Sequence, residues 1–438
     1  MASQILRAIT KQMLDRSTPP VSHPLRIPVL SKPEISKLQN GIEIANYLSK
    51  DQSLVSLDFI FPFSNLHFLE RQKENYAFRM LLEGTKQKTS KQIVDAISFL
   101  GATVEIAHQA DYETISISCL SRVLPDVLNI LKEIWSESIF PAKEWKTIAE
   151  TIIQQNAVNK QKTGFLAGKL LRKKLYGSEL DYGYSLDPEL LISFSPEILK
   201  DKFYAIQETG PALVVISGWI EKDSFKQLQD WLSGFKNIGN LAPKDGLLVP
   251  DLEPGINWDE KDDSQQTSLR IGKWSINSLH PDSSLFNVVL EIYGGYFGSR
   301  LMGNIREDKG WTYGISAQRA PNVAKPYWQI GSDVKGEVAL LAVSEIKKEA
   351  EILRNELVSE EELDLVKNYM IGQFISSITN CYGLADRYRS MWINGQSFER
   401  VQKNLITIQE ATVEQVQEIA QKYLQLDDAV IALAGKKP

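Results

Sequence analysis

The feature that most constrains the fold of this chain is an internal repeat. Residues 195–218 (SPEILKDKFYAIQETGPALVVISG) and residues 412–435 (TVEQVQEIAQKYLQLDDAVIALAG) match in length and in pattern. Each begins with a hydroxyl residue suited to cap a helix, continues with helical spacing of apolar residues, and ends in an alternating strand and a glycine. The two stretches lie 217 positions apart in a chain of 438 residues. A repeat offset by about half the chain predicts two related halves.

The elements predicted on either side of the middle support this interpretation. In each half, alternating strands come first, helices follow, and a strand closes the half. The first half is expected to hold strands at 41–49 and 53–63, helices at 74–85, 90–101 and 123–135, and a hairpin at 102–121. The second is expected to hold strands at 268–276 and 311–319, and helices at 284–297 and, behind the capping pair Ser359 and Glu362, at 363–378. Sheets with segregated helices, twice, predict an α+β fold.

The domain boundaries follow from composition. A chain of this length exceeds what one hydrophobic core usually organises. The stretch 237–263 is dense in Pro, Gly and Asp and has no sustained periodicity, so it is predicted to be a linker. The predicted domains are an N-terminal arm at 1–33, an α+β domain at 34–236, and a second α+β domain at 264–438.

Composition excludes several classes of protein. The formal charge is -6 and no basic stripe is interleaved with aromatics, so nucleic acid is not expected as a partner. No stretch approaches the roughly 20 apolar residues of a membrane span. Cys119 and Cys381 lack metal-site spacing and are expected to be packed thiols in a reducing compartment. The start, MASQILRAITKQMLDRSTPP, is weakly amphipathic. A frayed arm and a transit peptide are both open readings, with a bacterial cytoplasm as the expected location and an organelle as the alternative.

Residues 66–74, LHFLERQKE, spell H-x-x-E-R and come one letter short of an inverted zinc-peptidase motif. In that motif two His one helical turn apart bind zinc, and the Glu takes a proton from the metal-bound water. Here Arg71 replaces the second His. Arg stays protonated and has no lone pair to donate, so it places a fixed positive charge where a dication belongs. None of the four His lies four residues from another. An autonomous metallopeptidase built on His67 is therefore not expected.

Residues 83–102, EGTKQKTSKQIVDAISFLGA, resemble the segment that follows the zinc motif in the pitrilysin and mitochondrial processing peptidase family. Members of that family carry two related α+β halves joined by a linker. Counting back from the Gly-Thr pair, the family's H-x-x-E-H falls on Asn75, Phe78 and Arg79 rather than on His67. Both His and the Glu are thus replaced.

The remaining ligand of the family's zinc site is a Glu on the next long helix. Its place here falls near Gln154 or Gln155. The resemblance therefore implies a chain that binds no zinc, and that has no metal ligands of its own.

The match to this family is strongest at residues 293–319, YGGYFGSRLMGNIREDKGWTYGISAQR, where Arg306 and Tyr313 fit an Arg and a Tyr that members carry seven residues apart. The resemblance implies that these two donors contact a substrate held at another half's zinc, Tyr near the developing oxyanion and Arg at backbone carbonyls. Such a role suits their chemistry, because a forming oxyanion needs preorganised hydrogen-bond donors. The alternative is a core Tyr and a solvated Arg at a helix end.

Zinc positions lost in one half and an Arg/Tyr pair kept in the other predict a non-catalytic subunit of a heterodimeric zinc peptidase. In this hypothesis an H-x-x-E-H homologue supplies the zinc, the two chains enclose unfolded peptide substrates, and the isolated chain is inactive. A homodimer in isolation is open. The alternative is an inert structural or peptide-binding scaffold of the same fold.

Overall fold

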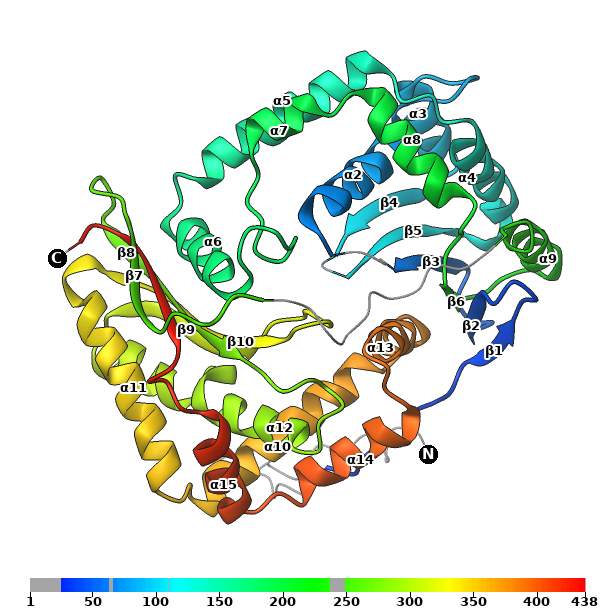
Figure 1. Ribbon diagram of the computed structural model, residues 1–438. Helices are drawn as coiled ribbons and strands as arrows, with labels where there is room; N and C mark the ends of the chain where they lie inside the picture. Colours follow the sequence, from blue (N-terminus) through cyan, green and yellow to red (C-terminus); the bar gives the residue numbers. More distant parts are fainter. Residues whose placement is uncertain (1–24, 63–65, 110, 237–248, 438) are drawn as a thin grey trace, which may run out of the picture.

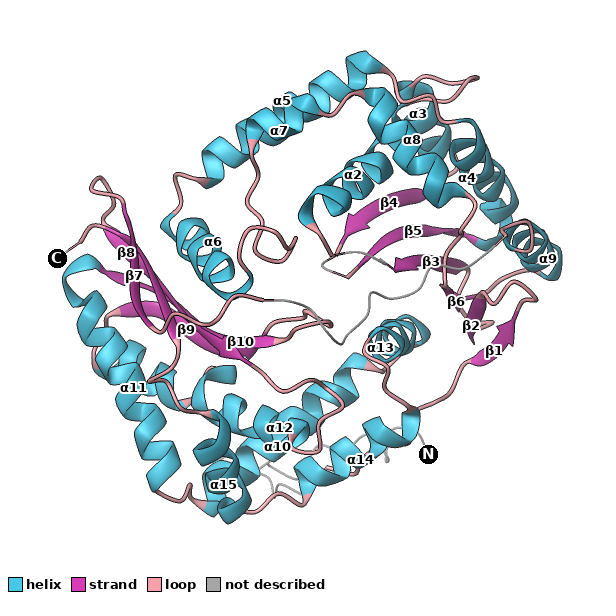
Figure 2. Cartoon of the chain, in the orientation of Figure 1, coloured by secondary structure: helices cyan, strands magenta, loops and turns pink. Residues whose placement is uncertain are grey.

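The computed structural model describes residues 25–62, 66–109, 111–236 and 249–437 (Figure 1). These residues form two β-sheets, each accompanied by its own helices (Figure 2). No helix in the described ranges is long and apolar enough to cross a membrane. The two sheets belong to the two halves that the repeat predicted.

The first half contains six strands and eight α-helices among the described residues. The strands are β1 (Glu34–Lys37), β2 (Glu43–Leu48), β3 (Leu54–Pro62), β4 (Thr103–His108), β5 (Tyr112–Leu120) and β6 (Leu213–Gly218). The helices are α2 (Phe68–Arg79), α3 (Ser90–Phe99), α4 (Leu124–Glu137), α5 (Ala142–Asn159), α6 (Thr163–Tyr176), α7 (Pro188–Ser193), α8 (Pro196–Gln207) and α9 (Lys222–Leu232).

The second half contains five strands and six α-helices in the same described part of the chain. The strands are β7 (Gly255–Glu260), β8 (Gln266–Trp274), β9 (Thr312–Arg319), β10 (Tyr327–Lys335) and β11 (Val430–Gly435). The helices are α10 (Ser283–Leu290), α11 (Ala339–Asn355), α12 (Glu360–Ser377), α13 (Cys381–Ile393), α14 (Phe398–Gln409) and α15 (Val413–Tyr423). Two π-helical turns, η3 (Glu291–Gly295) and η4 (Met302–Asp308), lie between α10 and β9.

The two sheets share one topology. The first has the strand order β1-β2-β6-β3-β5-β4 and the second β7-β11-β8-β10-β9. Apart from the extra edge strand β1, the two orders correspond. The closing strand of each half forms the parallel pair: β6 lies beside β2, with Leu213 opposite Glu43, and β11 lies beside β7, with Val430 opposite Gly255. Leu213 of β6 and Val430 of β11 occupy equivalent places in the two sheets and are 217 positions apart. The structure therefore confirms the α+β fold and the predicted duplication.

Each sheet has one face covered by its own helices and the other by a helix from the opposite half. Helix α6 belongs to the first half but packs on β8 and β11 of the second sheet. Its residues Leu171, Leu175 and Tyr176 form a hydrophobic cluster there with Tyr327 and Val430. Figure 1 shows α6 beside the second sheet and α13 beside the first.

The reverse exchange is made by α13, which packs on β2 and β6 of the first sheet. Polar contacts reinforce it, since Tyr388 donates to Glu43 and Arg389 Nη1 lies 2.8 Å from Asp58 Oδ2. Both halves therefore complete each other's hydrophobic packing.

Two predicted boundaries are wrong in part. The stretch 255–260, which composition placed in the linker, forms β7, because its backbone finds a parallel partner in β11, more than 170 residues further along the chain. Residues 237–248 of the predicted linker lie outside the described residues. Of the predicted arm, 25–33 are not frayed: Leu30 is buried among Phe374, Met391 and residues of α14.

Local details also differ from the sequence predictions. The helix predicted at 90–101 is capped by Thr89, which forms a capping box with Gln92. Ser359 caps α12 by accepting from the Glu362 amide, but the Glu362 carboxylate turns away to Arg300. Such caps compete with tertiary ion pairs for the same side chain.

We expect Leu171→Ala to destabilise the whole chain by about 2–5 kcal/mol, the usual cost of emptying a buried leucine site. Leu171 belongs to the first half but is fully buried against the second sheet, where an added Cβ at Gly272 would lie 2.8 Å from its Cδ1. Urea unfolding measures the change. Leu365→Ala, at a site that is 52% exposed, is the matched control and should cost less than about 0.5 kcal/mol. If Leu171→Ala destabilised the first half alone, the packing of α6 on the second sheet would be contradicted.

Candidate functional site

Arg306 and Tyr313 come together at one open cavity of about 440 Å³. Arg306 lies in the π-helical turn η4, and Tyr313 is the second residue of β9. The Tyr313 side chain is 88% exposed. Tyr313 and Ile315 lie two residues apart in β9 and so share a strand face, but Ile315 is buried whereas Tyr313, next to the start of the strand, is exposed. Tyr313 is therefore not a core aromatic.

A short turn sets the distance between the two donors. Gly310 has a positive φ of 62°, its amide bonds to the Arg306 carbonyl at 3.1 Å, and the Trp311 amide bonds to the Ile305 carbonyl at 3.0 Å. Only a residue without a Cβ adopts this conformation readily. The turn folds the start of β9 back beside η4, so a spacing of seven residues brings both side chains to one opening.

Aromatic rings orient the Arg306 side chain. Its guanidinium carbon lies 4.6 Å from the centre of the Phe297 ring, and Tyr296 and Tyr369 line the same cavity with their rings 5.3 Å apart. Stacking fixes the plane of a guanidinium without using its N–H donors. Within the described residues Arg306 forms no ion pair or side-chain hydrogen bond, so these donors are available to a ligand.

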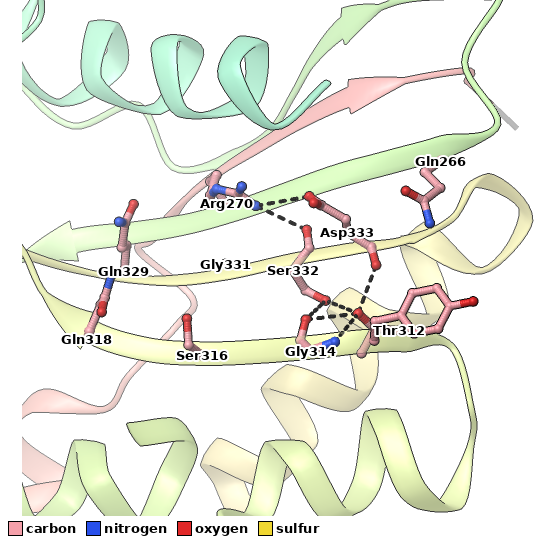
Figure 3. A pocket seen from close by; sticks show the side chains of 11 residues that line it. Gln266, Arg270, Thr312, Gly314, Ser316, Gln318, Gln329, Gly331, Ser332 and Asp333 are labelled. Atoms are coloured by element: carbon pink, nitrogen blue, oxygen red, sulfur yellow. Dashed lines mark hydrogen bonds and ion pairs between the residues drawn. The ribbon is translucent and has the colours of Figure 1, made fainter. Parts of the chain in front are cut away.

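A second cavity of about 430 Å³ adjoins the first, and Tyr313 lines both. Figure 3 shows Arg270, Ser332 and Asp333 at this second cavity. It lies on the polar face of β8, β9 and β10 and is lined by amide, hydroxyl and charged side chains: Gln266, Arg270, Thr312, Ser316, Gln318, Gln329, Ser332 and Asp333. Arg270 donates to the Ser332 carbonyl at 3.1 Å and lies 3.5 Å from Asp333. Such a face offers donors and acceptors to a peptide backbone without selecting side chains.

The three positions where the family motif falls cannot bind a metal in this structure. Phe78 is 1% exposed and packs against Phe61 at 5.2 Å between ring centres. Asn75 accepts a hydrogen bond of 3.0 Å from Arg79 Nε, which places a cation beside it. Gln154 and Gln155 are exposed on α5. No group of three His, Cys, Asp or Glu side chains within the described ranges is placed to hold a metal ion.

The H-x-x-E-R stretch has a structural role that sequence reasoning missed. His67 is the N-cap of α2, with its Nδ1 accepting from the Leu69 amide at 3.4 Å. Arg71 is fully buried and lies 3.3 Å from Glu74 and 4.0 Å from Asp181. No sequence signal identified this residue, because Asp181 is over 100 positions away.

Further titratable groups surround Arg71. His108 lies 2.7 Å from Glu113 and 3.7 Å from Asp181. Burial opposes ionisation of Asp181, but hydrogen bonds and the charge on Arg71 outweigh it and lower the pKa of Asp181. The cluster ties α2 to the β4–β5 hairpin and to the segment before α7.

We expect Arg71→Leu to destabilise the fold by about 3–5 kcal/mol at pH 7, because it removes a buried cation that Glu74 and Asp181 share. Lys202 still pairs with Glu74 and His108 with Asp181 in the variant. Urea unfolding tests this, with Arg122→Leu, at an exposed site, as the matched control. An equal loss in the two variants would contradict the role of the cluster.

Wild type and Arg71→Leu should also differ in how their free energy of unfolding depends on pH. Asp181 has a depressed pKa in the folded state, so its contribution is present above the unfolded pKa of about 3.9 and is lost as the pH falls through the folded value. Arg71→Leu removes part of that depression. The stability gap between wild type and variant should therefore narrow below about pH 4, and a gap that widens there would contradict this cause.

We expect a chelator to leave the melting temperature of the isolated chain unchanged, because Asn75, Phe78 and Arg79 provide no zinc ligand set. Differential scanning fluorimetry with and without EDTA measures this. Zinc at one equivalent per chain after chelator washing would contradict it.

Comparison with known proteins places this chain in a family. The model "Insulinase (Peptidase family M16)" matches residues 73–181, and the model "Peptidase M16 inactive domain" matches residues 211–370. Together they cover more than half of the chain. The first match begins at residue 73, so it includes Asn75, Phe78 and Arg79 and leaves His67 outside.

Individual relatives agree. "Non-peptidase homolog YmxG" of Helicobacter pylori is 25% identical over 389 residues, covering 82% of this chain and 83% of that protein. "Uncharacterized zinc protease YmxG" of Bacillus subtilis is 22% identical over 318 residues, covering 71% and 74%.

Solved structures share the fold. The peptidase M16 inactive domain of Pseudomonas fluorescens superposes with a TM-score of 0.80 at 23% identity, over 93% of this chain and 98% of that chain. A protease from Helicobacter pylori gives 0.81 at 14% identity, over 93% and 100%. The expected resemblance to the pitrilysin family is confirmed: the chain belongs to peptidase family M16, and the part of it that the structure describes contains no zinc site.

Proposed function

We propose that this chain is the non-catalytic subunit of a heterodimeric zinc peptidase that degrades or processes unfolded peptides. The observation that carries the proposal is the shared cavity of Arg306 and Tyr313, with both side chains free to donate to a bound ligand. The other half of the chain supplies no zinc ligands at the family positions. A chain that keeps substrate donors and lacks the metal site needs a partner that has one.

The two donors have distinct roles in this proposal. The Tyr313 hydroxyl donates to the carbonyl oxygen of the scissile peptide as negative charge develops on it, and Arg306 holds a neighbouring backbone carbonyl. Both act in the active site of an H-x-x-E-H homologue, whose zinc would supply Lewis-acid polarisation and a nucleophilic water.

The polar face beside Tyr313 fits a peptide substrate. Its amides and hydroxyls, among them Gln318, Gln329 and Ser316, suit backbone groups of an extended chain. Such contacts tolerate many sequences, as a peptidase acting on unfolded chains requires. The bacterial origin of the relatives fits a bacterial cytoplasm as the proposed location, with a homodimer possible in isolation.

The alternative function is a peptide-binding or structural scaffold. The relative named as a non-peptidase homologue is compatible with it. It differs from the leading proposal in one respect, since it requires no catalytic partner and gives Tyr313 no part in bond cleavage.

Reconstitution separates the two. The purified chain is mixed with its cognate H-x-x-E-H partner, and cleavage of a fluorogenic unfolded peptide is followed. We expect Tyr313→Phe to lower kcat by about 10²-fold, as loss of one oxyanion donor does, and Arg306→Ala to lower kcat/KM by a similar factor.

Matched controls use exposed sites in the first half: Tyr204→Phe and Arg122→Ala should leave both constants within about twofold. Size-exclusion chromatography checks that each variant still pairs with the partner. Unchanged rates in Tyr313→Phe and Arg306→Ala would remove the proposed role, and failure of the chains to associate would favour the scaffold.

A further inference from the structure

A third cavity, of about 640 Å³, lies away from the Arg306–Tyr313 site and shares no lining residue with it. It is enclosed by the segment 275–280 after β8, by the loop 320–326 between β9 and β10, and by α13. Arg319, at the end of β9, lies at its wall, six residues along the strand from Tyr313 and roughly 20 Å away at the usual rise of a strand. Its volume suits a small ligand.

The ionisable residues that line this cavity are all basic. Its lining includes Arg319, Lys325 and His280, and none of the described lining residues is Asp or Glu. The whole chain carries a net charge of -6, so a wall with cations alone is unlike its composition. His280 Nδ1 accepts from the Asp282 amide at 3.1 Å, so the neutral ring carries its proton on Nε2 and is a donor there.

Arg319 is a partly buried cation held by neutral acceptors. Its Nη1 donates to Ser283 Oγ at 2.7 Å and to Asn287 Oδ1 at 3.3 Å, and its Nη2 donates to the Ile276 carbonyl. Burial lowers the pKa of Arg319 to about 10, and no carboxylate offsets that loss of solvation. It remains charged at neutral pH. Its Nε and one Nη2 hydrogen have no acceptor among the described residues, which leaves one edge of the guanidinium for a bidentate anion.

The loop that closes the cavity is fixed from outside. The Lys325 carbonyl accepts from Tyr176 Oη at 2.6 Å, and the Val323 amide donates to Asp111 Oδ2 at 3.1 Å. Both partners belong to the first half, so closure of the two halves shapes this site. A cavity formed before binding loses less entropy when a ligand enters.

The remaining lining is mixed, with serine and asparagine residues beside an apolar part. Ile276, Leu279 and Val323 line the cavity beside the cations. A ligand that fills it therefore needs an anionic group for Arg319 and an apolar part of a few carbons.

We propose that this cavity binds an amphiphilic carboxylate of the kind found at the C-terminal end of a peptide with an apolar last residue. Arg319 binds the carboxylate through its free edge, Lys325 adds a second positive charge, and the apolar wall holds the side chain. The inference extends the proposed function, because peptides enclosed by this protein carry such an end. It does not depend on a catalytic partner.

The test is isothermal titration calorimetry of the full chain with N-acetyl-leucine. N-acetyl-leucinamide, which differs only in lacking the charge, should bind at least tenfold more weakly, as loss of charge-assisted hydrogen bonds predicts. N-acetylglycine and inorganic phosphate, which lack the apolar part, should also bind more weakly. Equal affinity of the amide, or of phosphate, would overturn the proposal.

Variants locate the site. Arg319→Lys keeps the charge but loses the bidentate edge, and should weaken N-acetyl-leucine about tenfold. Lys325→Gln should weaken it several-fold, with an unchanged melting temperature as the check on folding. Arg122→Lys, exposed and remote, is the matched control and should bind as wild type. Unchanged binding in both Arg319→Lys and Lys325→Gln would overturn the assignment. The outcome leaves the reconstitution test untouched, since no partner is present.

Discussion

The structure depends on an exchange of helices between its halves. Each sheet exposes an apolar face that its own helices do not cover, and burial of that face is the main driving force available to it. The covering helix comes from the opposite half, α6 on the second sheet and α13 on the first. Ion pairs such as Arg389 with Asp58 then lie at the edge of these contacts. Neither half has a complete core alone, so the two halves depend on each other for stability.

The duplicated scaffold has different chemistry in its two halves. In the first half, the motif positions on α2 are occupied by a core Phe78 and a hydrogen-bonded Asn75–Arg79 pair. In the second half, π-helical turns and Gly310 hold Arg306 and Tyr313 at an open cavity. The first half therefore uses its motif positions for packing, whereas the second half keeps two hydrogen-bond donors at an open cavity. This division is what makes a partner necessary in the proposed function.

Sequence reasoning reached the fold and the candidate donors but failed at long-range contacts. The spacing of residues close together in the chain predicts the repeat and the order of strands and helices. The same local spacing gives the seven-residue separation of Arg306 and Tyr313. In the sequence, Arg71 only stands where the zinc motif would have its second His. In the structure it is the cation of a buried cluster that includes residues of β4, β5 and the segment before α7. Likewise, 255–260 read as linker because pairing with β11 leaves no mark in its own composition.

The sequence by itself determined that two related α+β halves form, that the motif positions hold no zinc ligands, and that an Arg and a Tyr stand seven residues apart. Only the tertiary structure decided which helix covers which sheet, where Arg71 is buried, and that Arg319 and Lys325 share a cavity whose loop is anchored by the opposite half. The physical reason is separation along the chain. Periodicity and capping act over a few residues, whereas these arrangements rest on contacts between residues more than a hundred positions apart or on the way two halves close together.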